Sequence, residues 1–288
     1  MLNKRKDLIK AVFIADALSF GSHWVYSTDE LKEEYSGIID EYKAPMAKFH
    51  QGKKAGDLSH YGEQAFALLQ SISNHQGFDL KQFRDDWIQY LENNEMYMDH
   101  AMQDSLEKFK DSNTLSGAEN HELGGIARSL PLILKADITE QDFLDLIHLT
   151  HNSEVVDQTA KFVFAVIKDI LAGKDYKEAI KANKDLNEFT AESFAKIGSK
   201  DNIVASADER GQGCSVEQGF PIVLDVLWNA DNHLEALTLN IMAGGDTSAR
   251  AMVIAAVMAA DNGLDTIPEK LIVGFNKSKK VKELLTDY

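Results

Sequence analysis

The sequence predicts an all-α fold, built as a single domain over residues 1–288. Apolar residues recur at helical spacing along nearly the whole chain. The alternating pattern of half-buried strands is absent, and only 4 prolines interrupt the 288 residues. This length is within the reach of one hydrophobic core, and no shift in composition marks a linker. We therefore expect about a dozen helices in one domain.

The stretches that predict helices are spread over the chain. Pro131 is expected to kink a helix or to begin a new one, and Pro221 to begin one. The short apolar segment 203–205 is too brief to predict a strand. The clearest helical stretches lie at residues 8–15, 65–72, 163–171 and 253–260.

Long irregular connections are expected at residues 36–60, 110–121 and 198–214, where the helical pattern breaks. Long loops inside a compact helical domain commonly carry binding and catalytic residues. The sequence therefore directs the search for a site to these loops and to the helices that they enter.

Charge and composition exclude some classes of partner. With 46 acidic and 30 basic residues, the formal net charge of −16 disfavours nucleic acid and anionic membranes. A small anionic ligand stays compatible with this net charge, because a helix N-terminus reverses the field locally.

The cysteine content and the N-terminus bear on the cellular compartment. The single cysteine, Cys214, excludes an internal disulfide, and residues 1–10 lack the apolar core of a signal peptide. We expect a cytoplasmic protein.

The most unusual local sequence is the segment 243–251, directly before an apolar helix. Gly244 and Gly245 permit close backbone approach, and the first turn of the helix offers N–H groups to an anion. The Asp246 carboxylate suits a hard cation, with the Ser248 hydroxyl as a weak second ligand. The alternative is a glycine turn with Asp246 as N-cap.

Two further segments place polar groups at helices. Asp16 lies in an apolar helix, so its carboxylate must either face a cleft or hydrogen-bond a neighbouring helix end. Ser59, His60, Tyr61 and Glu63 stand together at a helix entrance, where a pocket needs polar side chains. The alternative for this second segment is a helix cap made by Ser59 and Glu63.

A fourth segment, residues 116–125, leads from a polar loop into a helix that begins with small residues. It offers Ser116, Gly117, His121 and Glu122 as candidate contacts for a ligand. The alternative is a helix start that is merely loosened by glycine.

Taken in order, these segments resemble the ADP-ribosylglycohydrolase family, including its J1-crystallin-like branch. The similarity covers residues 8–262. Residues 15–19 resemble the family's Gly-Asp-Ala-Leu-Gly helix, and residues 116–131 resemble its Ser-Gly and Arg-x-x-Pro segment. Thr150-His151 resembles a Thr-His step of the family, and residues 211–214 resemble a glycine loop. Residues 244–248 resemble the Gly-Gly-Asp-Thr-Asp motif.

The resemblance implies a single orthogonal multi-helix domain with a central cleft that often holds two magnesium ions. It also implies hydrolysis of the glycosidic bond between ADP-ribose and a protein side chain or small acceptor. Such a reaction passes through an oxocarbenium-like state, which carboxylates and metal-held water stabilise. The diphosphate would lie against glycine loops and helix N-termini.

The metal motifs depart from the family pattern. Active members carry Thr-Asp-Asp-Thr where this chain has Ser59-His60-Tyr61-Gly62. Asp246 remains, but Ser248 replaces the next acid and Ala249 the following hydroxyl. These ligands are too few for two cations that each require about six oxygens. Magnesium is thus expected from the family but not as a tight pair here, and a single weak ion at Asp246 and Ser248 stays open.

Two functional interpretations follow, and the oligomeric state is left open. The chain is either a divergent hydrolase of an ADP-ribosyl or related N- or O-glycosidic bond, or a member without catalysis that binds a nucleotide sugar or serves a structural, crystallin-like role. For the hydrolase, the catalytic candidates are Asp16, Glu63, Glu122 and Asp246. The substrate, a small molecule or an ADP-ribosylated protein, would contact Ser59, His60, Tyr61, Ser116, Gly117, His121, Gly211, Gly213, Gly244 and Gly245.

Overall fold

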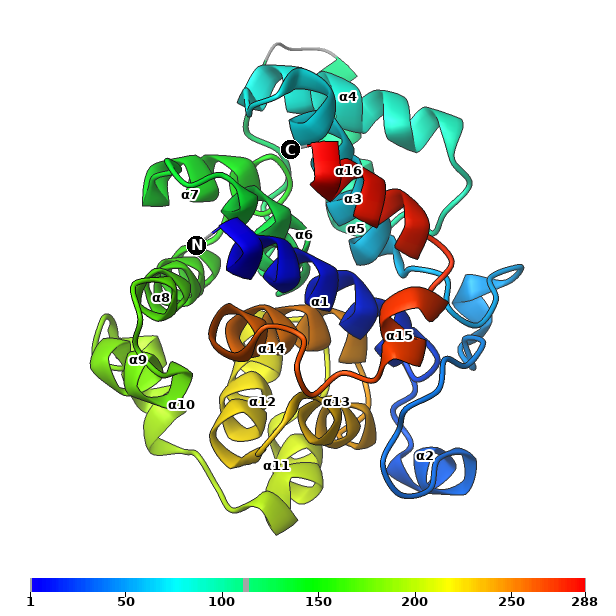
Figure 1. Cartoon of the computed structure of the whole chain (residues 1–288), viewed down its shortest axis with the longest axis vertical. Coiled ribbons are helices and arrows are strands. Elements are labelled where there is room, and N and C mark those ends of the chain that lie inside the picture. The colour runs from blue at the N-terminus through cyan, green and yellow to red at the C-terminus, as the bar shows by residue number, and fades with distance from the viewer. Residues whose placement is uncertain (1, 111–113, 288) are drawn as a thin grey trace.

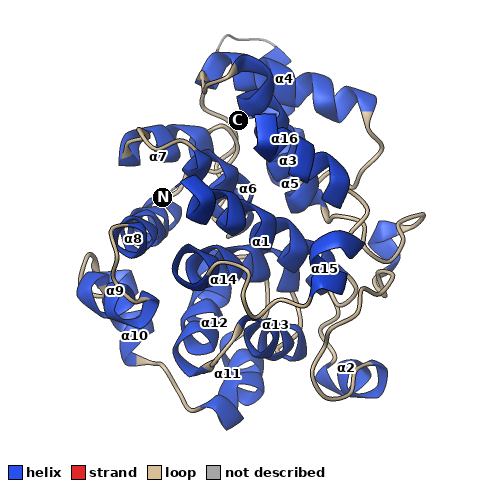
Figure 2. Cartoon of the chain, viewed as in Figure 1, coloured by secondary structure: helices blue, strands red, loops and turns tan. Residues whose placement is uncertain are grey.

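The chain folds as helices joined by loops, as the sequence predicts. The computed structural model describes residues 2–110 and 114–287. Over these residues it contains sixteen α-helices, three short 3₁₀ helices and no strand, so the all-α prediction is confirmed (Figure 2). The only extended pairings within this part are two isolated bridges, Val25 with Gly245 and Glu122 with Ser215.

Most elements follow one another with short connections, and longer ones separate α2 from η1 and α5 from α6. In chain order they are α1 (Leu2–Phe20), α2 (Thr28–Glu34), η1 (Lys48–His50), α3 (His60–His75), α4 (Leu80–Asn93), α5 (His100–Lys110), α6 (Gly124–Ser129), η2 (Leu130–Leu134), α7 (Glu140–His148), α8 (Glu154–Leu171), α9 (Tyr176–Asn183), α10 (Glu188–Ala195), η3 (Lys200–Asn202), α11 (Ile203–Arg210), α12 (Val216–Asn229), α13 (His233–Met242), α14 (Thr247–Asn262), α15 (Glu269–Gly274) and α16 (Ser278–Asp287).

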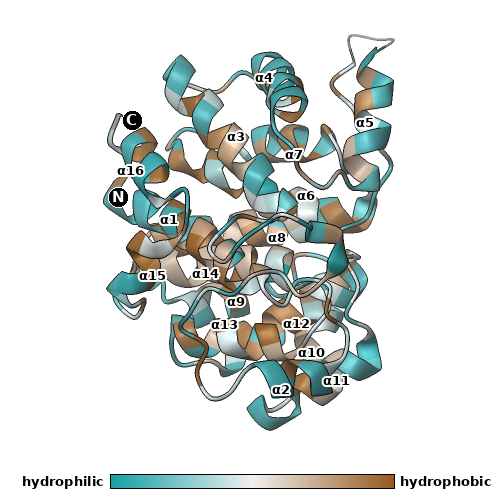
Figure 3. Ribbon diagram, turned by 90° about the vertical axis from the view of Figure 1, so that its right-hand side faces the viewer, coloured by the Kyte–Doolittle hydropathy of each residue, from teal (hydrophilic) through white to brown (hydrophobic). Residues whose placement is uncertain are grey.

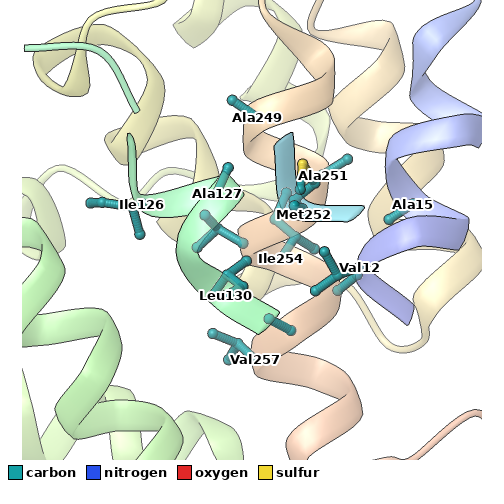
Figure 4. Packing of buried hydrophobic residues seen from close by; sticks show 14 of the residues in the cluster. Val12, Ala15, Ile126, Ala127, Leu130, Ala249, Ala251, Met252, Ile254 and Val257 are labelled. Atoms are coloured by element: carbon teal, nitrogen blue, oxygen red, sulfur yellow. The ribbon is translucent and has the colours of Figure 1, made fainter. Parts of the chain in front are cut away.

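Helices α1 and α14 form the centre of the molecule. They pack against each other more extensively than any other pair of described elements, and lie side by side in Figure 1. Both are rich in alanine, which lets the two backbones approach closely. Figure 4 shows Val12 of α1 beside Ile254 of α14, with Ala127 and Leu130 from α6 and η2 near the same helix.

The two central helices are enclosed on nearly every side. All residues from Thr247 to Ala260 of α14 are buried, and so are the residues of α1 from Ala11 to Phe20. A helix that is buried all round belongs to a core rather than to a surface. Figure 3 shows hydrophobic residues along α12 and α14, while the peripheral helices α2 and α4 are largely hydrophilic. Polar side chains on these two helices are therefore enclosed by protein and need partners there.

Hydrogen bonds join three helix ends in this centre. The Thr247 hydroxyl, at the start of α14, donates to the Ser19 carbonyl near the end of α1 at 2.9 Å. The Ser59 hydroxyl, at the entrance of α3, donates to the Asp16 carboxylate at 2.5 Å. These contacts bring the C-terminal half of α1 to the N-termini of α3 and α14, where the predicted motifs lie.

Two expectations about the chain need correction. The segment 198–214 contains η3 and α11, because Ile203 and Ala207 bury one face of a short helix. Pro221 does not begin a helix but lies inside α12, which starts at Val216 and forgoes one backbone hydrogen bond at the proline. Pro131 behaves as expected and stands in the first turn of η2 after α6.

The search for membrane-spanning segments gives a negative result. Among the described residues, no helix combines the length and the apolar character required to cross a bilayer.

Candidate functional site

Asp246 is the acid at the centre of the predicted C-terminal motif, and it is enclosed by protein. The residue is only 1% exposed and caps α14, with Oδ1 accepting the Ala249 N–H at 3.4 Å. The Tyr61 hydroxyl donates to Oδ2 at 3.2 Å, and His23 Nδ1 lies 3.3 Å from Oδ1. Burial raises the pKa of the Asp246 carboxyl above its usual range. Each carboxylate oxygen thus has a protein neighbour.

The glycines before Asp246 are required by the backbone. Gly244 and Gly245 have φ values of 71° and 70°, in the left-handed region that favours glycine. A Cβ on Gly245 would stand 2.0 Å from the Gln212 carbonyl oxygen. The Gly245 N–H donates to Val25 at 2.7 Å, and the Asp246 N–H to Gln212 at 2.9 Å. These N–H groups are therefore engaged within the protein, which matches the alternative of a glycine turn with an Asp N-cap.

Asp16 of α1 and Ser59, at the start of α3, form a second buried polar pair. The Ser59 N–H and hydroxyl both donate to the Asp16 carboxylate, at 2.9 and 2.5 Å, while the same hydroxyl caps α3. A Cβ on Gly62 would meet Asp16 Oδ2 at 1.9 Å, so glycine is needed there. Burial raises the pKa of Asp16 to about 7. The arrangement matches the helix-end hydrogen bond that was the alternative for Asp16.

His60 faces an acid that the sequence analysis missed. Its Nε2 lies 3.3 Å from Oδ2 of Asp99, and both residues are buried. The other Asp99 oxygen accepts the Met102 N–H at 2.7 Å at the start of α5. Burial alone would raise the pKa of Asp99, but the contact with His60 and the Met102 N–H lower it overall. The position of Asp99 three residues before Met102 predicts a cap for α5. This local pattern does not reveal the contact of Asp99 with His60, which comes from a distant segment.

Aromatic rings and imidazoles fill the space around His60. His23 stacks on Trp24 with centroids 4.5 Å apart, and Trp24 stacks on His50 at 5.0 Å. Tyr97 meets Trp24 edge to face at 4.9 Å. Burial holds the pKa of His23 well below its usual value and lowers that of His50 to about 3. Trp24 has a φ of 64°, rare for a residue with a side chain, and such strain tends to occur at functional sites.

Glu63 and Glu122 lie in different electrostatic surroundings. Glu63 accepts bonds from Lys277 Nζ and the Tyr90 hydroxyl, each at 2.5 Å, and from Lys53 Nζ at 3.3 Å. Burial alone would raise its pKa, but these partners lower it. Glu122 is half-buried, and burial together with the charges of Asp99 and Asp246 raises its pKa to about 7.

The remaining predicted contacts lie in the loops around the site. Ser116 is exposed and donates to Asn152 at 3.1 Å, whereas Gly117 fits against the backbone of Leu149. His121 is exposed. Gly211 and Gly213 both pack against Gln218, which accepts the Gly213 N–H at 2.8 Å.

The predicted segments share one neighbourhood. Ser59 bonds to Asp16, its neighbour Tyr61 bonds to Asp246, and Gly124 lies against the Tyr61 ring. A pocket of about 620 Å³ adjoins this group and has His60 in its wall, together with residues of η1 and the loop before α5. Tyr61, Asp16 and Asp246 are buried and absent from the lining of this pocket.

The residues at the expected metal positions do not fit a pair of magnesium ions. His60 contacts Asp99, and the Tyr61 phenol bonds to Asp246, where the resemblance places two carboxylates. Ser248 is buried, and its hydroxyl has no hydrogen-bond partner. Across residues 2–110 and 114–287, no three His, Cys, Asp or Glu side chains are grouped to hold a metal ion. Hard dications need more oxygen ligands than this set provides.

Comparison with known proteins places the chain in a family. Crystallin J1A of Tripedalia cystophora is 23% identical over 305 aligned residues, covering 97% of this chain and 94% of the relative. Crystallin J1B of the same organism is 22% identical, with 98% and 94% covered. A solved structure described as an ADP-ribosylglycohydrolase-related protein complex has the same fold, with a TM-score of 0.75, 16% identity, and 99% and 96% of the two chains covered.

The sequence signature of the family extends over almost the entire chain. The model for the ADP-ribosylglycohydrolase family matches residues 3–287, from the first turn of α1 to the end of α16. The match includes every segment around Asp246, Asp16 and His60. The protein whose motifs and fold are described above therefore belongs to the ADP-ribosylglycohydrolase family.

Proposed function

We propose that this chain is a family member without magnesium-dependent hydrolysis, which binds a small nucleotide-sugar type of ligand or serves a structural, crystallin-like role. The observation that carries the proposal is the bond from the Tyr61 hydroxyl to Asp246. A phenol in the place of a second carboxylate brings a hydrogen-bond donor and no negative charge, whereas magnesium is held mainly by carboxylate and other oxygen ligands. Asp246 is thus satisfied by the protein itself.

The surroundings of Asp246 support the same proposal. His23 has a lowered pKa and borders one oxygen as a neutral ring. Of the other catalytic candidates, Asp16 is bound by Ser59 and Glu63 by two lysines and a tyrosine. The names of the two Tripedalia crystallins also suit a role outside catalysis.

Partners and location complete the proposal. The proposed ligand is a small molecule or an ADP-ribosylated protein, and the net charge of −16 disfavours nucleic acid and anionic membranes as partners. A cytoplasmic location is consistent with a chain whose single cysteine cannot form an internal disulfide.

The test is release of ADP-ribose from peptides ADP-ribosylated on arginine or serine, with and without magnesium. We expect no release above the blank in either condition. Asp246→Ala serves as the comparison, because a magnesium-dependent reaction would need that carboxylate. Release that magnesium stimulates and that this substitution abolishes would refute the proposal.

A second candidate is hydrolysis of an ADP-ribosyl or related glycosidic bond without metal, and Glu122 favours it. A half-buried carboxyl with a pKa of about 7 is suited to protonate a leaving group near neutral pH. Asp99, whose charge contributes to that pKa, would be the ionised partner of the pair.

Substitution of Glu122 distinguishes this candidate from the first proposal. If Glu122 is the acid of a metal-independent hydrolysis, release of ADP-ribose is unaffected by magnesium and falls by about 10²–10⁴-fold in Glu122→Gln. Glu119→Gln is the matched control, because Glu119 is an exposed acid of the same loop. Equal rates in the two variants would exclude Glu122 as the acid.

A further inference from the structure

A second groove, which we call the C-terminal groove, lies between α15, α16 and the first half of α1. These three helices pack against one another, and α15 and α16 lie next to α1 in Figure 1. The groove has a volume of about 400 Å³, within the range typical of small-molecule pockets. It shares no lining residue with the pocket beside His60, so it is a separate candidate site.

The walls of the C-terminal groove are mainly apolar. The apolar residues that line it are Ile272, Val273, Phe275 and Val281. Phe275 and Val281 are buried, whereas Val273 is 60% exposed, the largest fraction for any large hydrophobic side chain among the described residues. An apolar wall that continues from buried side chains to a solvent-exposed one indicates a surface that an apolar ligand would cover.

The charged side chains of the groove favour an anionic group on that ligand. Lys10, Lys279 and Lys282 line it together with one carboxylate, Glu269. Lys10 is paired with Asp7 at 3.1 Å, whereas Lys279 and Lys282 are exposed and form no ion pair with another described residue. Residues three apart lie on the same side of a helix, so these two ammonium groups can reach one anion. They make a local site of positive charge on a chain of net charge −16.

We propose that the C-terminal groove binds a straight-chain fatty carboxylate. The hydrocarbon chain lies along Ile272, Val273 and Phe275, and the carboxylate is held by Lys279 and Lys282. The occupant is a single amphiphilic molecule, because the groove has the volume of a small-molecule pocket and the acidic chain as a whole disfavours an anionic membrane. This binding activity goes beyond the proposed function and does not depend on it.

Titration of the full chain with octanoate, followed by calorimetry below the concentration of micelle formation, tests the proposal. Octanoate is expected to bind at least about five-fold more tightly than 1-octanol, which has the same chain length but no charge. Affinity should rise about two- to four-fold per methylene from hexanoate to decanoate, because each methylene removes apolar surface from water. Added salt is expected to weaken octanoate but not 1-octanol.

Single substitutions separate the two parts of the site. Lys279→Gln and Lys282→Gln should each weaken octanoate about two- to five-fold and leave 1-octanol unchanged. Val273→Ser should weaken both ligands about two- to four-fold, because it removes part of the apolar wall. The matched controls are Lys181→Gln and Leu186→Ser, at exposed positions outside the groove, and neither should change binding.

Four results would overturn the proposal. The first is absence of binding of octanoate and decanoate at millimolar concentration, and the second is equal affinity for octanoate and 1-octanol. The third is an equal effect of Lys279→Gln and Lys181→Gln, because the ligand would then lie elsewhere. The fourth is binding to anionic vesicles, or dimer formation in sedimentation, that Val273→Ser abolishes while octanoate does not bind, because the groove would then serve that partner. None of these measurements involves release of ADP-ribose, so the proposed function is tested separately.

Discussion

At the scale of single residues, Tyr61 replaces an acid of the family motif and hydrogen-bonds the acid that remains. Its phenol is fully buried and donates to Asp246, and burial raises its pKa well above the usual value, so it stays a donor. His60, its neighbour in sequence, contacts Asp99 instead. The two substitutions therefore convert a pair of expected cation ligands into partners for protein carboxylates.

Removal of the Tyr61 hydroxyl should destabilise the fold. Tyr61→Phe leaves Asp246 Oδ2 buried without its described donor, which costs about 1–3 kcal/mol in the free energy of unfolding. Urea denaturation at pH 7 measures this free energy. Tyr35→Phe is the matched control, because the buried Tyr35 hydroxyl has no hydrogen-bond partner, so its loss should leave the free energy of unfolding unchanged or raise it. Equal effects of the two substitutions would show that the bond to Asp246 contributes nothing.

At the scale of elements, glycines determine how closely segments meet at the start of α14. The turn at Gly245 pairs with the segment after α1 and also touches Gln212, just after α11. A side chain at this position would separate three segments at once. The N-terminus of α14, and with it Asp246, is placed by this turn.

Gly245→Ala is expected to reduce the free energy of unfolding by about 3 kcal/mol or more, because the new Cβ would lie 2.0 Å from the Gln212 oxygen. Gly37→Ala is the comparison. Gly37 has a similar φ of 65° but no atom within 4 Å of the new Cβ, so the expected loss is about 1 kcal/mol. Thermal or urea denaturation measures both losses, and a Gly245 variant as stable as the Gly37 variant would contradict the close approach described here.

Glu63 joins several elements through its ion pairs. It stands on α3 and binds Tyr90 of α4, Lys53 of the first loop and Lys277 before α16. Glu63→Gln should lower the free energy of unfolding at pH 7 by about 1–3 kcal/mol. This is less than the loss of a fully buried ion pair would cost, because both lysines are partly exposed to solvent. The exposed Glu33 of α2 provides the control, with no expected loss for Glu33→Gln.

The loss at Glu63 should depend on pH in a defined direction. The folded-state pKa of Glu63 is below its unfolded value of 4.5, so its stabilisation is present above pH 4.5 and disappears as pH falls through the folded pKa. The difference between wild type and Glu63→Gln should therefore shrink in denaturation experiments at acid pH. A difference that stays constant from pH 7 to pH 3 would indicate that the ion pairs contribute nothing.

At the scale of the whole molecule, the sequence predicts the fold class but not the contacts between distant segments. The all-α class follows from local periodicity, as in the buried face of α8. The segment 198–214 was missed because α11 is short and polar, with Ile203 and Ala207 as its buried residues. The surroundings of His60 were missed because His23, His50 and Asp99 come from separate segments and meet only in the folded chain.

The same reasoning explains the outcome for the candidate acids. A pattern identifies Asp16, Glu63, Glu122 and Asp246 as acids near helix ends, but it does not reveal their partners. Ser59, Lys277 and Tyr61, which hydrogen-bond three of them, are known only from the fold. Glu122 alone is half-buried and keeps a strongly raised pKa, which makes it the acid most available for chemistry.

The central claim is that the Tyr61 phenol and the neutral His23 ring, rather than cations, lie against the Asp246 carboxylate. Thermal unfolding with and without millimolar magnesium chloride, at matched ionic strength, tests it most directly. The account predicts the same melting temperature in both conditions, because a ligand that does not bind the folded state cannot stabilise it. A rise of several degrees, about 1 kcal/mol or more of coupling, that Asp246→Asn abolishes would contradict it.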